Sequence, residues 1–241
     1  VRSNHLSYRP SDASVVADPI LIATGPHATF PRVEPSSAPM RLMVYDATWI
    51  GRMPSQAGLT SSWIAGGALY RALGRLDALY GATSWEDALA WLCSVEPKRG
   101  VAEVQYWGHG RWGRAFVGRD AIDREAVDDR THSRHHDLLA LRARLAGDAL
   151  IWFRTCETFG RSEGHAFATS WARFFQCRVA GHTHVIGPFQ SGLHSLGPDD
   201  TPSWSVYEGT VAGTEGGAMS KPGLPNTITC CHRHGTSSPV T

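Results

Sequence analysis

The sequence of 241 residues has no apolar run long enough to cross a membrane and no surplus of one charge sign. A bilayer span needs about 20 consecutive apolar residues. Lys and Arg number 23 against 22 Asp and Glu, which gives a formal net charge of +1 and no basic stripe for a phosphate backbone. We therefore expect a soluble, cytoplasmic protein without a membrane or nucleic-acid partner. The first residues lack a secretory signal pattern, although without an initiator Met an upstream leader could have been removed.

Regular cysteine spacing and internal repeats are also lacking. Five cysteines, an odd number without a regular interval, do not form the framework of a disulfide-rich fold. A reducing compartment is the simpler expectation. Nothing in the sequence sets an oligomeric state.

Three regions differ in composition. Residues 1–39 are rich in proline and predict a tail or linker, with one short strand at "PILIAT". Residues 40–200 carry regular apolar patterns and predict one α/β domain. Residues 201–241 are rich in Gly, Pro and Ser and predict an extension that wraps the domain and frays.

Apolar runs in the middle region predict strands over 41–47, 101–107 and 149–153 and from 178 onward. Helical spacing of apolar residues lies between these runs. The stripes are Leu69, Leu73, Leu76 and Tyr80, ended by Gly81; Trp85, Ala88, Leu89 and Leu92, capped by Ser84 and Asp87; Leu138, Leu141 and Leu145, ended by Gly147; and Phe167, Trp171, Phe174 and Phe175. Because strands and helices alternate, we expect a mostly parallel sheet with helices on both faces.

Two chemically capable residues follow predicted strands. His109 lies between two glycines in "QYWGHGRWG", just after the strand 101–107, and Cys156 lies in "RTCETFG", just after the strand 149–153. In open α/β sheets, reactive groups gather beyond the carboxyl ends of the strands. We therefore predict that His109 and Cys156 lie close together.

This order resembles the caspase-like superfamily of cysteine peptidases (clan CD), which includes bacterial CHAT-type domains. Its caspases place a His about 50 residues upstream of the Cys, and here the interval is 47 positions. "WGHG" matches the His-Gly element, whereas "RTCETFG" shares only the Cys and the apolar strand before it. The resemblance covers roughly residues 40–190. It implies a three-layer sandwich and a cysteine endopeptidase with Cys156 as nucleophile, His109 as general acid/base, a polypeptide substrate and no cofactor.

The chemistry gives an independent reason to pair the two residues. A thiol must lose its proton to attack an amide, and an imidazole or a nearby helix N-terminus favours the thiolate. The helix with the Phe167 stripe follows Cys156 closely. The resemblance implies an oxyanion hole formed by the backbone N–H groups of Gly110 and Cys156. A glycine at position 110 would let the substrate backbone come close.

Loops at the same edge of the sheet are expected to set specificity. Arg52, after the first strand, is placed to meet an acidic substrate side chain, as a basic residue does in caspases. Gln190 and Ser191 would shape the same pocket. The sequence thus predicts an acidic preference at the cleaved residue.

Two other functions stay open. A catalytically inactive member of the same fold would serve as a protein-interaction module. A zinc-binding module could use the pair His182 and His184 with a tail group, although adjacent cysteines do not give the usual ligand spacing. That tail group is Cys230, Cys231, His232 and His234. Cys93 and Cys177 are assigned to structure, and no metal site is predicted.

Overall fold

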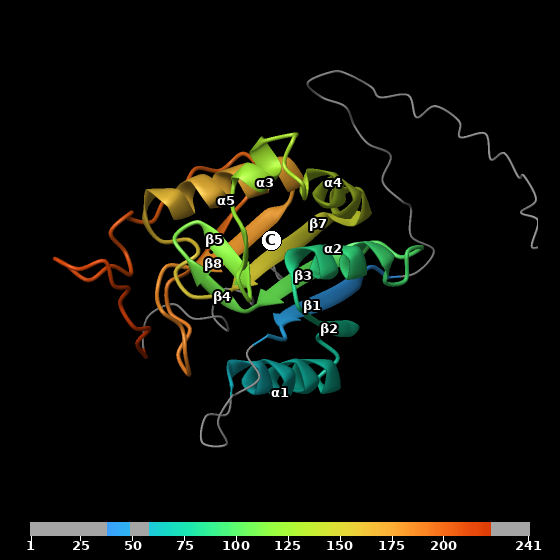
Figure 1. The fold of residues 1–241 in the computed structure, drawn as a ribbon, viewed down its shortest axis with the longest axis horizontal. Coiled ribbons are helices and arrows are strands. Elements are labelled where there is room, and N and C mark those ends of the chain that lie inside the picture. Colours follow the sequence, from blue (N-terminus) through green and yellow to red (C-terminus); the bar gives the residue numbers. More distant parts are fainter. Residues whose placement is uncertain (1–37, 49–57, 223–241) are drawn as a thin grey trace, which may run out of the picture. The chain divides into compact units, whose positions relative to one another are not determined.

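A six-stranded sheet forms the centre of the molecule (Figure 1). The computed structural model describes residues 38–48 and 58–222, all within one compact unit, Pro31–Thr241. The spatial order of the strands is β2, β1, β3, β7, β8, β9. Their bounds are β1 Met40–Asp46, β2 Ala78–Ala82, β3 Val101–Trp107, β7 Leu145–Arg154, β8 Arg178–His182 and β9 Leu193–Leu196.

The first five of these strands run parallel, and only β9 at the edge is antiparallel to its neighbour. Leu42, Val44, Val104 and Ile151 on the central strands are almost fully buried. Such apolar strands are typical of a parallel sheet that is covered on both faces. The prediction of an α/β protein with a mostly parallel sheet is confirmed.

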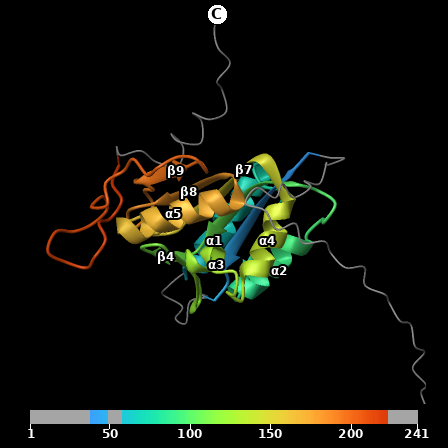
Figure 2. The ribbon, with the colours of Figure 1, turned by 90° about the horizontal axis from the view of Figure 1, so that it is seen from above.

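Helices lie on both sides of this sheet (Figures 1 and 2). On one side, α1 (Leu59–Ala72) packs Trp63 and Tyr70 against Met43 and Trp107. The opposite side belongs to the main core, which contains the buried faces of α2, α4 and α5. The bounds of the helices on that side are α2 Trp85–Ser94, α3 Glu125–Asp128, α4 His135–Arg144 and α5 Arg161–Phe175.

A second, three-stranded antiparallel sheet follows β3 directly. It consists of β4 (His109–Arg111), β5 (Arg114–Val117) and β6 (Asp120–Ile122). These short strands were not predicted from the sequence, because their few apolar residues do not form a long alternating run. Since β4 begins at His109, this small sheet fixes where the histidine lies.

The first predicted helix was wrong in its extent. The structure ends α1 at Ala72, and Gly74 turns the chain with a φ of +65°. Leu76 lies in the following loop, whereas Tyr80 and Gly81 belong to β2. Leu69 and Leu73 are mostly exposed. The apparent stripe therefore joins residues of two different elements across a turn.

Two other helical predictions hold with small changes. Ser84 caps α2 by accepting a hydrogen bond from the Asp87 backbone N at 3.1 Å. In α5, Phe167, Trp171 and Phe175 are buried as expected. The predicted stripe Leu138, Leu141 and Leu145 is confirmed only in part. Leu138 and Leu141 lie in α4, whereas Leu145 is the first residue of β7.

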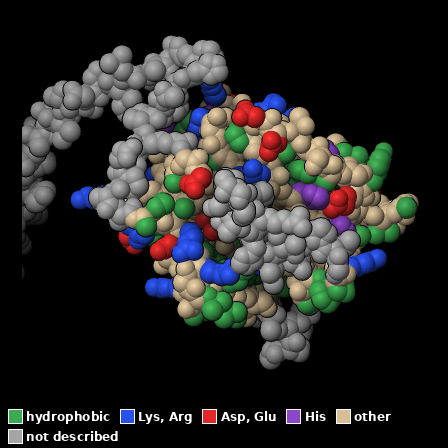
Figure 3. All heavy atoms as spheres, turned by 180° about the vertical axis from the view of Figure 1, so that it is seen from behind, with side chains coloured by type: hydrophobic (Ala, Val, Ile, Leu, Met, Phe, Trp, Pro, Cys, Tyr) green, Lys and Arg blue, Asp and Glu red, His purple; other side chains and the backbone are tan. Residues whose placement is uncertain are grey.

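No helix within the described ranges is long and apolar enough to cross a membrane. Side chains of both charge signs lie among hydrophobic ones on the face shown in Figure 3. The segment "PILIAT" lies outside the described residues. The three-region division of the chain stays a prediction.

Candidate active site

Adjacent strands place His109 and Cys156 at the same edge of the sheet. β3 and β7 pair in parallel, and Trp107 at the end of β3 lies opposite Arg154 at the end of β7. His109 lies two residues beyond Trp107, and Cys156 lies two residues beyond Arg154. Each therefore emerges from its strand at the same level of the sheet.

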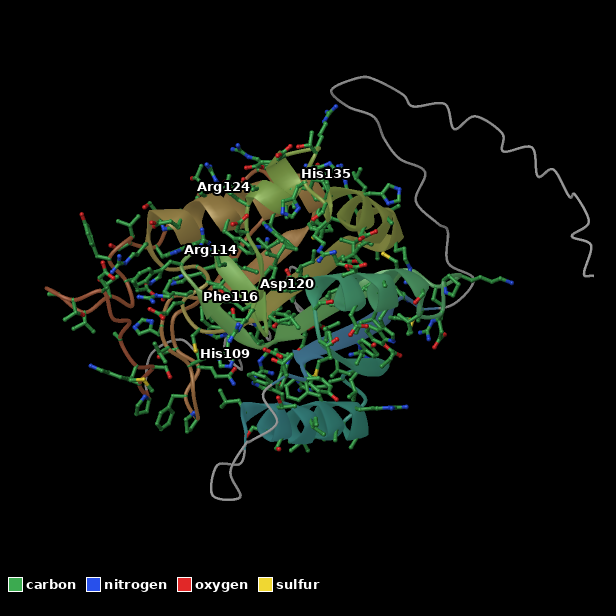
Figure 4. All side chains as sticks on the ribbon, in the orientation of Figure 1. His109, Arg114, Phe116, Asp120, Arg124 and His135 are labelled. Carbon is green, nitrogen blue, oxygen red and sulfur yellow. The ribbon has the colours of Figure 1, made fainter. Side chains whose placement is uncertain are left out.

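His109 is the first residue of β4 in the small sheet (Figure 4). Its backbone pairs with Phe116 of β5, and its ring meets Trp63 of α1 edge-on, with 5.5 Å between ring centroids. The histidine is half-buried. Burial lowers the pKa of its imidazole, and the negative charge of Asp46 acts in the opposite direction. The ring is therefore mostly neutral, which suits a general base.

Backbone hydrogen bonds hold the Cys156 loop, defined here as residues 155–160, from two sides. Glu157 and Phe159 donate their N–H groups to the carbonyls of His184 and His182, at 3.0 and 2.9 Å. From the side of the small sheet, Trp112 donates to the Glu157 carbonyl at 3.0 Å. The loop is thus tied both to the chain that follows β8 and to the chain that carries His109.

Three residues other than glycine have left-handed backbone around this loop. Trp112, Glu157 and Arg161 have φ values of 32°, 54° and 61°, a region that residues other than glycine rarely adopt. Such conformations persist where surrounding contacts impose them, and they cluster at functional sites. Residues with left-handed backbone therefore occur both in the segment that carries His109 and in the segment that carries Cys156.

The chain at Gly110 touches the Cys156 loop. A Cβ atom added at Gly110 would lie 2.7 Å from both the Cys156 carbonyl oxygen and the Thr155 Cβ, and closer still to Thr158 Oγ1. No side chain fits in this space. The glycine expected to allow close approach of a substrate backbone is therefore also required by the packing of the Cys156 loop.

The thiol of Cys156 is half-buried and donates to the Ile186 carbonyl at a sulfur–oxygen distance of 3.8 Å. Burial raises the pKa of the thiol, and the charge of Glu157 adds to the effect. This corrects the expectation that the surroundings favour the thiolate. The largest cause is burial of the thiol, and α5 begins only at Arg161, beyond the Cys156 loop.

The residues expected to shape a substrate pocket have different outcomes. Arg52 lies outside the described residues. The Gln190 side-chain oxygen accepts a hydrogen bond from Arg154 Nη2 at 2.6 Å, two residues before Cys156. Ser191 is fully buried, and its hydroxyl accepts a hydrogen bond from the backbone N of Lys221 at 2.8 Å. Gln190 is thus linked to the site, whereas Ser191 holds the backbone at Lys221.

Three residues at this edge were missed from the sequence: Asp46, Arg154 and Glu157. Asp46 ends β1, and Arg154 ends β7 with its guanidinium 3.8 Å from the centre of the Trp107 ring. Glu157 directly follows the cysteine and is 7% exposed. The rule that picked out His109 and Cys156, polar residues at the carboxyl ends of strands, would have found Asp46 and Arg154 as well.

Several residues after position 200 contact the segments that carry His109 and Cys156. Trp204 donates its indole N–H to the Phe159 carbonyl at 2.9 Å. Arg111, which follows His109 in β4, donates to the Glu215 carbonyl at 3.0 Å. Met219 forms a bridge with Val185. The segment after residue 200 therefore contacts both the Cys156 loop and the small sheet.

Metal binding finds no support in the residues described. No group of three His, Cys, Asp or Glu side chains is placed to hold an ion in residues 38–48 and 58–222. His182 and His184 are both buried, and the four tail residues proposed as their partners lie outside the described ranges. Cys93 is half-buried in α2, and Cys177 is buried after α5.

The buried imidazole of His182 predicts a stability that depends on pH. Burial lowers the pKa of His182 to about 3. The unfolded chain binds a proton near pH 6.5, whereas the folded chain does not. Stability should therefore be complete above about pH 6.5 and fall on acidification by up to about 1.4 kcal/mol per pH unit, down to pH 3.

Urea unfolding at several pH values measures this slope in the wild type and in His182→Gln. The glutamine does not titrate, so the variant should have a smaller slope between pH 6.5 and 4. Equal slopes in the two proteins would assign the acid sensitivity to other groups.

The described part of the chain also contains a wide groove. It has a volume of about 1140 Å³ and is lined by residues that include Arg41, Trp152 and Leu193. Neither His109 nor Cys156 lines it. The candidate site is therefore defined by the chemically capable side chains that follow β3 and β7, and not by the size of a cavity.

Comparison with known proteins gives no match, either to a protein-family model, to a curated protein or to a solved structure. The class of protein that the fold defines is an α/β protein with a mostly parallel six-stranded sheet. A narrower assignment depends on the site alone.

Proposed function

We propose that this chain is a caspase-like cysteine endopeptidase in which Cys156 is the nucleophile and His109 the general acid/base. The observation that supports this proposal is the pairing of β3 with β7, which brings the residues after Trp107 and Arg154 to one edge of the sheet. Contact between Gly110 and the Cys156 carbonyl adds to it. The strand connectivity and the helices on both faces are consistent with a three-layer sandwich.

The reaction begins with transfer of the Cys156 thiol proton to the imidazole of His109 while the sulfur attacks the substrate carbonyl carbon. The carbonyl oxygen becomes negatively charged, and the backbone N–H groups of Gly110 and Cys156 are proposed to stabilise it. His109 then gives its proton to the leaving nitrogen as the C–N bond breaks. This leaves a thioester on Cys156 and a free amine.

Water completes the cycle. His109 takes a proton from the water as its oxygen attacks the thioester carbon. The C–S bond breaks, the sulfur regains a proton and a carboxylic acid leaves. No cofactor takes part in these steps.

The pKa directions indicate how the proton moves. The pKa of His109 is lowered and that of Cys156 is raised, so the resting pair is neutral at pH 7. The proton therefore passes to His109 during attack and not before substrate binds.

Arg154 supports an acidic preference at the cleaved residue. Arg154 is the last residue of β7, two residues before Cys156, and is 7% exposed; its guanidinium lies over the Trp107 ring and donates a hydrogen bond to Gln190. A planar guanidinium binds a carboxylate through two hydrogen bonds. With Arg52 outside the described ranges, Arg154 is the cation that we assign to the substrate pocket.

A panel of peptides that differ only at the cleaved residue tests the proposal. We expect hydrolysis of the peptides with Asp or Glu, and a preference over Asn or Gln of about 10-fold or more. Arg154→Gln should remove this preference, whereas Arg154→Lys should retain part of it. A preference for Arg or Lys would refute the acidic pocket, and no hydrolysis of any peptide would count against the peptidase.

A second candidate is a protein-interaction module on the same fold. The raised pKa of the Cys156 thiol favours it, because a protonated thiol is a poor nucleophile. The two candidates differ in whether the reactivity of Cys156 depends on His109.

A further inference from the structure

Asp46 is an anion enclosed at the same edge of the sheet. It ends β1, the strand next to β3, and it is 0% exposed. Burying a carboxylate is costly unless hydrogen bonds compensate for the lost water. Asp46 must therefore accept hydrogen bonds from donors close by. The segments that supply these donors are the segments that Asp46 holds in place.

The donors come from two segments. Asp46 Oδ1 accepts hydrogen bonds from the backbone N and the hydroxyl of Thr48, at 2.8 and 2.6 Å. Asp46 Oδ2 accepts one from the backbone N of Gly118 at 3.0 Å. Gly118 directly follows β5, in which Phe116 pairs with His109. The carboxylate thus ties β1 to the small sheet that carries the histidine.

Among the described residues, Asp46 is the charged group that acts on the pKa of His109. From α1, the neutral ring of Trp63 packs edge-on against the imidazole. Tyr106 of β3 also lies within the field of Asp46, and burial raises the pKa of its phenol far above its ordinary value, so it stays neutral. The Cys156 thiol is neutral at pH 7 as well, for the same reason.

Glu157 is the other carboxylate of the Cys156 loop. Its neighbours are Arg111 and Arg161, whose charges act on it, and Trp112, which donates a hydrogen bond to it. Its charge affects Cys156, whereas the negative charge that acts on His109 is that of Asp46. The two acids therefore act on different members of the pair.

We propose that Asp46 is a positioning residue for His109: its buried carboxylate fixes the small sheet on which His109 lies and stabilises the imidazolium that forms when Cys156 loses its proton. This inference rests on the proposed function. A buried anion near the imidazole favours the charged ring, and it does so most strongly where water is excluded. Asp46 contacts no substrate atom in this proposal and is not itself a catalytic residue.

Asp46→Asn removes the charge and keeps the shape of the side chain. Its remaining carbonyl oxygen can still accept the Gly118 N–H, whereas the amide nitrogen that replaces Oδ1 cannot accept from the Thr48 backbone N, so some loss of stability is expected. We expect kcat to fall by about 10- to 100-fold, with KM for the same peptide unchanged within about 2-fold. We also expect the acidic limb of the kcat/KM profile, which reports the pKa of His109, to move to lower pH. A purely structural role would change stability and leave this limb in place.

A second readout does not need activity. NMR titration of the His109 ring in a Cys156→Ala background should show a lower pKa after Asp46→Asn. Thr48→Val is the matched control, because it deletes one donor to the same carboxylate and leaves the charge; the titration should stay where it is in the Cys156→Ala parent. If Asp46→Asn does not fold, Asp46→Ser provides a smaller neutral acceptor for the same titration.

The outcomes separate the two proposals. A shifted titration in a protein that hydrolyses no peptide would support the link between Asp46 and His109 and refute the peptidase. Active protein in which Asp46→Asn changes neither the titration nor the acidic limb would overturn the positioning role and leave the peptidase intact.

Discussion

Replacing Cys156 with alanine is expected to reduce peptide hydrolysis by at least about 10³-fold, because no other group can form the thioester. His109→Ala should cause a loss of similar size. The double variant should be no slower than either single variant, since the two residues act in one proton transfer. Initial rates measured with the best acidic peptide give all three values.

Cys93→Ala and Cys177→Ala are matched controls for this prediction. They delete a thiol from α2 and from the turn after α5, on the side of the sheet occupied by the main core. Each should retain most of the activity while losing about 1 kcal/mol of stability to the smaller side chain. Wild-type activity in Cys156→Ala would show that hydrolysis comes from another group or from a contaminant.

Gly110→Ala is expected to have the second large effect, because the added methyl group has no space. Its Cβ would lie 2.7 Å from the Cys156 carbonyl oxygen, so the Cys156 loop or β4 must move. A shift of about 1 Å in a catalytic group can cost about 10²-fold in rate. We expect kcat/KM to fall by about this factor and the free energy of unfolding to fall by about 1–3 kcal/mol.

Gly187→Ala is the control, because a Cβ added at Gly187 meets nothing within 4 Å. Gly187 lies in the loop after β8, next to the residue that accepts the Cys156 hydrogen bond. This variant should keep both the rate and the stability. If Gly110→Ala were also unchanged in rate and in urea unfolding, the close packing of β4 against the Cys156 loop would be wrong.

The sequence was informative where apolar residues repeat over a whole element. The stripe Phe167, Trp171 and Phe175 predicts α5 because each of these side chains is buried on one face. The strand 101–107 was found in full because it is bounded by glycines and consists mainly of residues that the core buries. From these elements the alternating pattern, and with it the mostly parallel sheet, could be predicted.

Short elements and electrostatics could not be read in the same way. β4 has three residues, too few to show a period, and the extent of α1 depends on a turn at Gly74. The pKa of Cys156 depends on how deeply the thiol is buried and on the charge of Glu157. These quantities are set by the packing of distant segments, including the chain around Ile186 and the segment after residue 200.

The central claim is that His109 takes the proton of Cys156 at a shared edge of the sheet, and covalent labelling tests it most directly. The measurement is the rate at which a peptide-linked thiol reagent with an acidic residue modifies Cys156, followed by intact mass and peptide mapping. We predict one adduct on Cys156, with a rate that falls at least about 10²-fold in His109→Ala. Equal rates in the wild type and in His109→Ala would contradict the account and leave the interaction module as the better description.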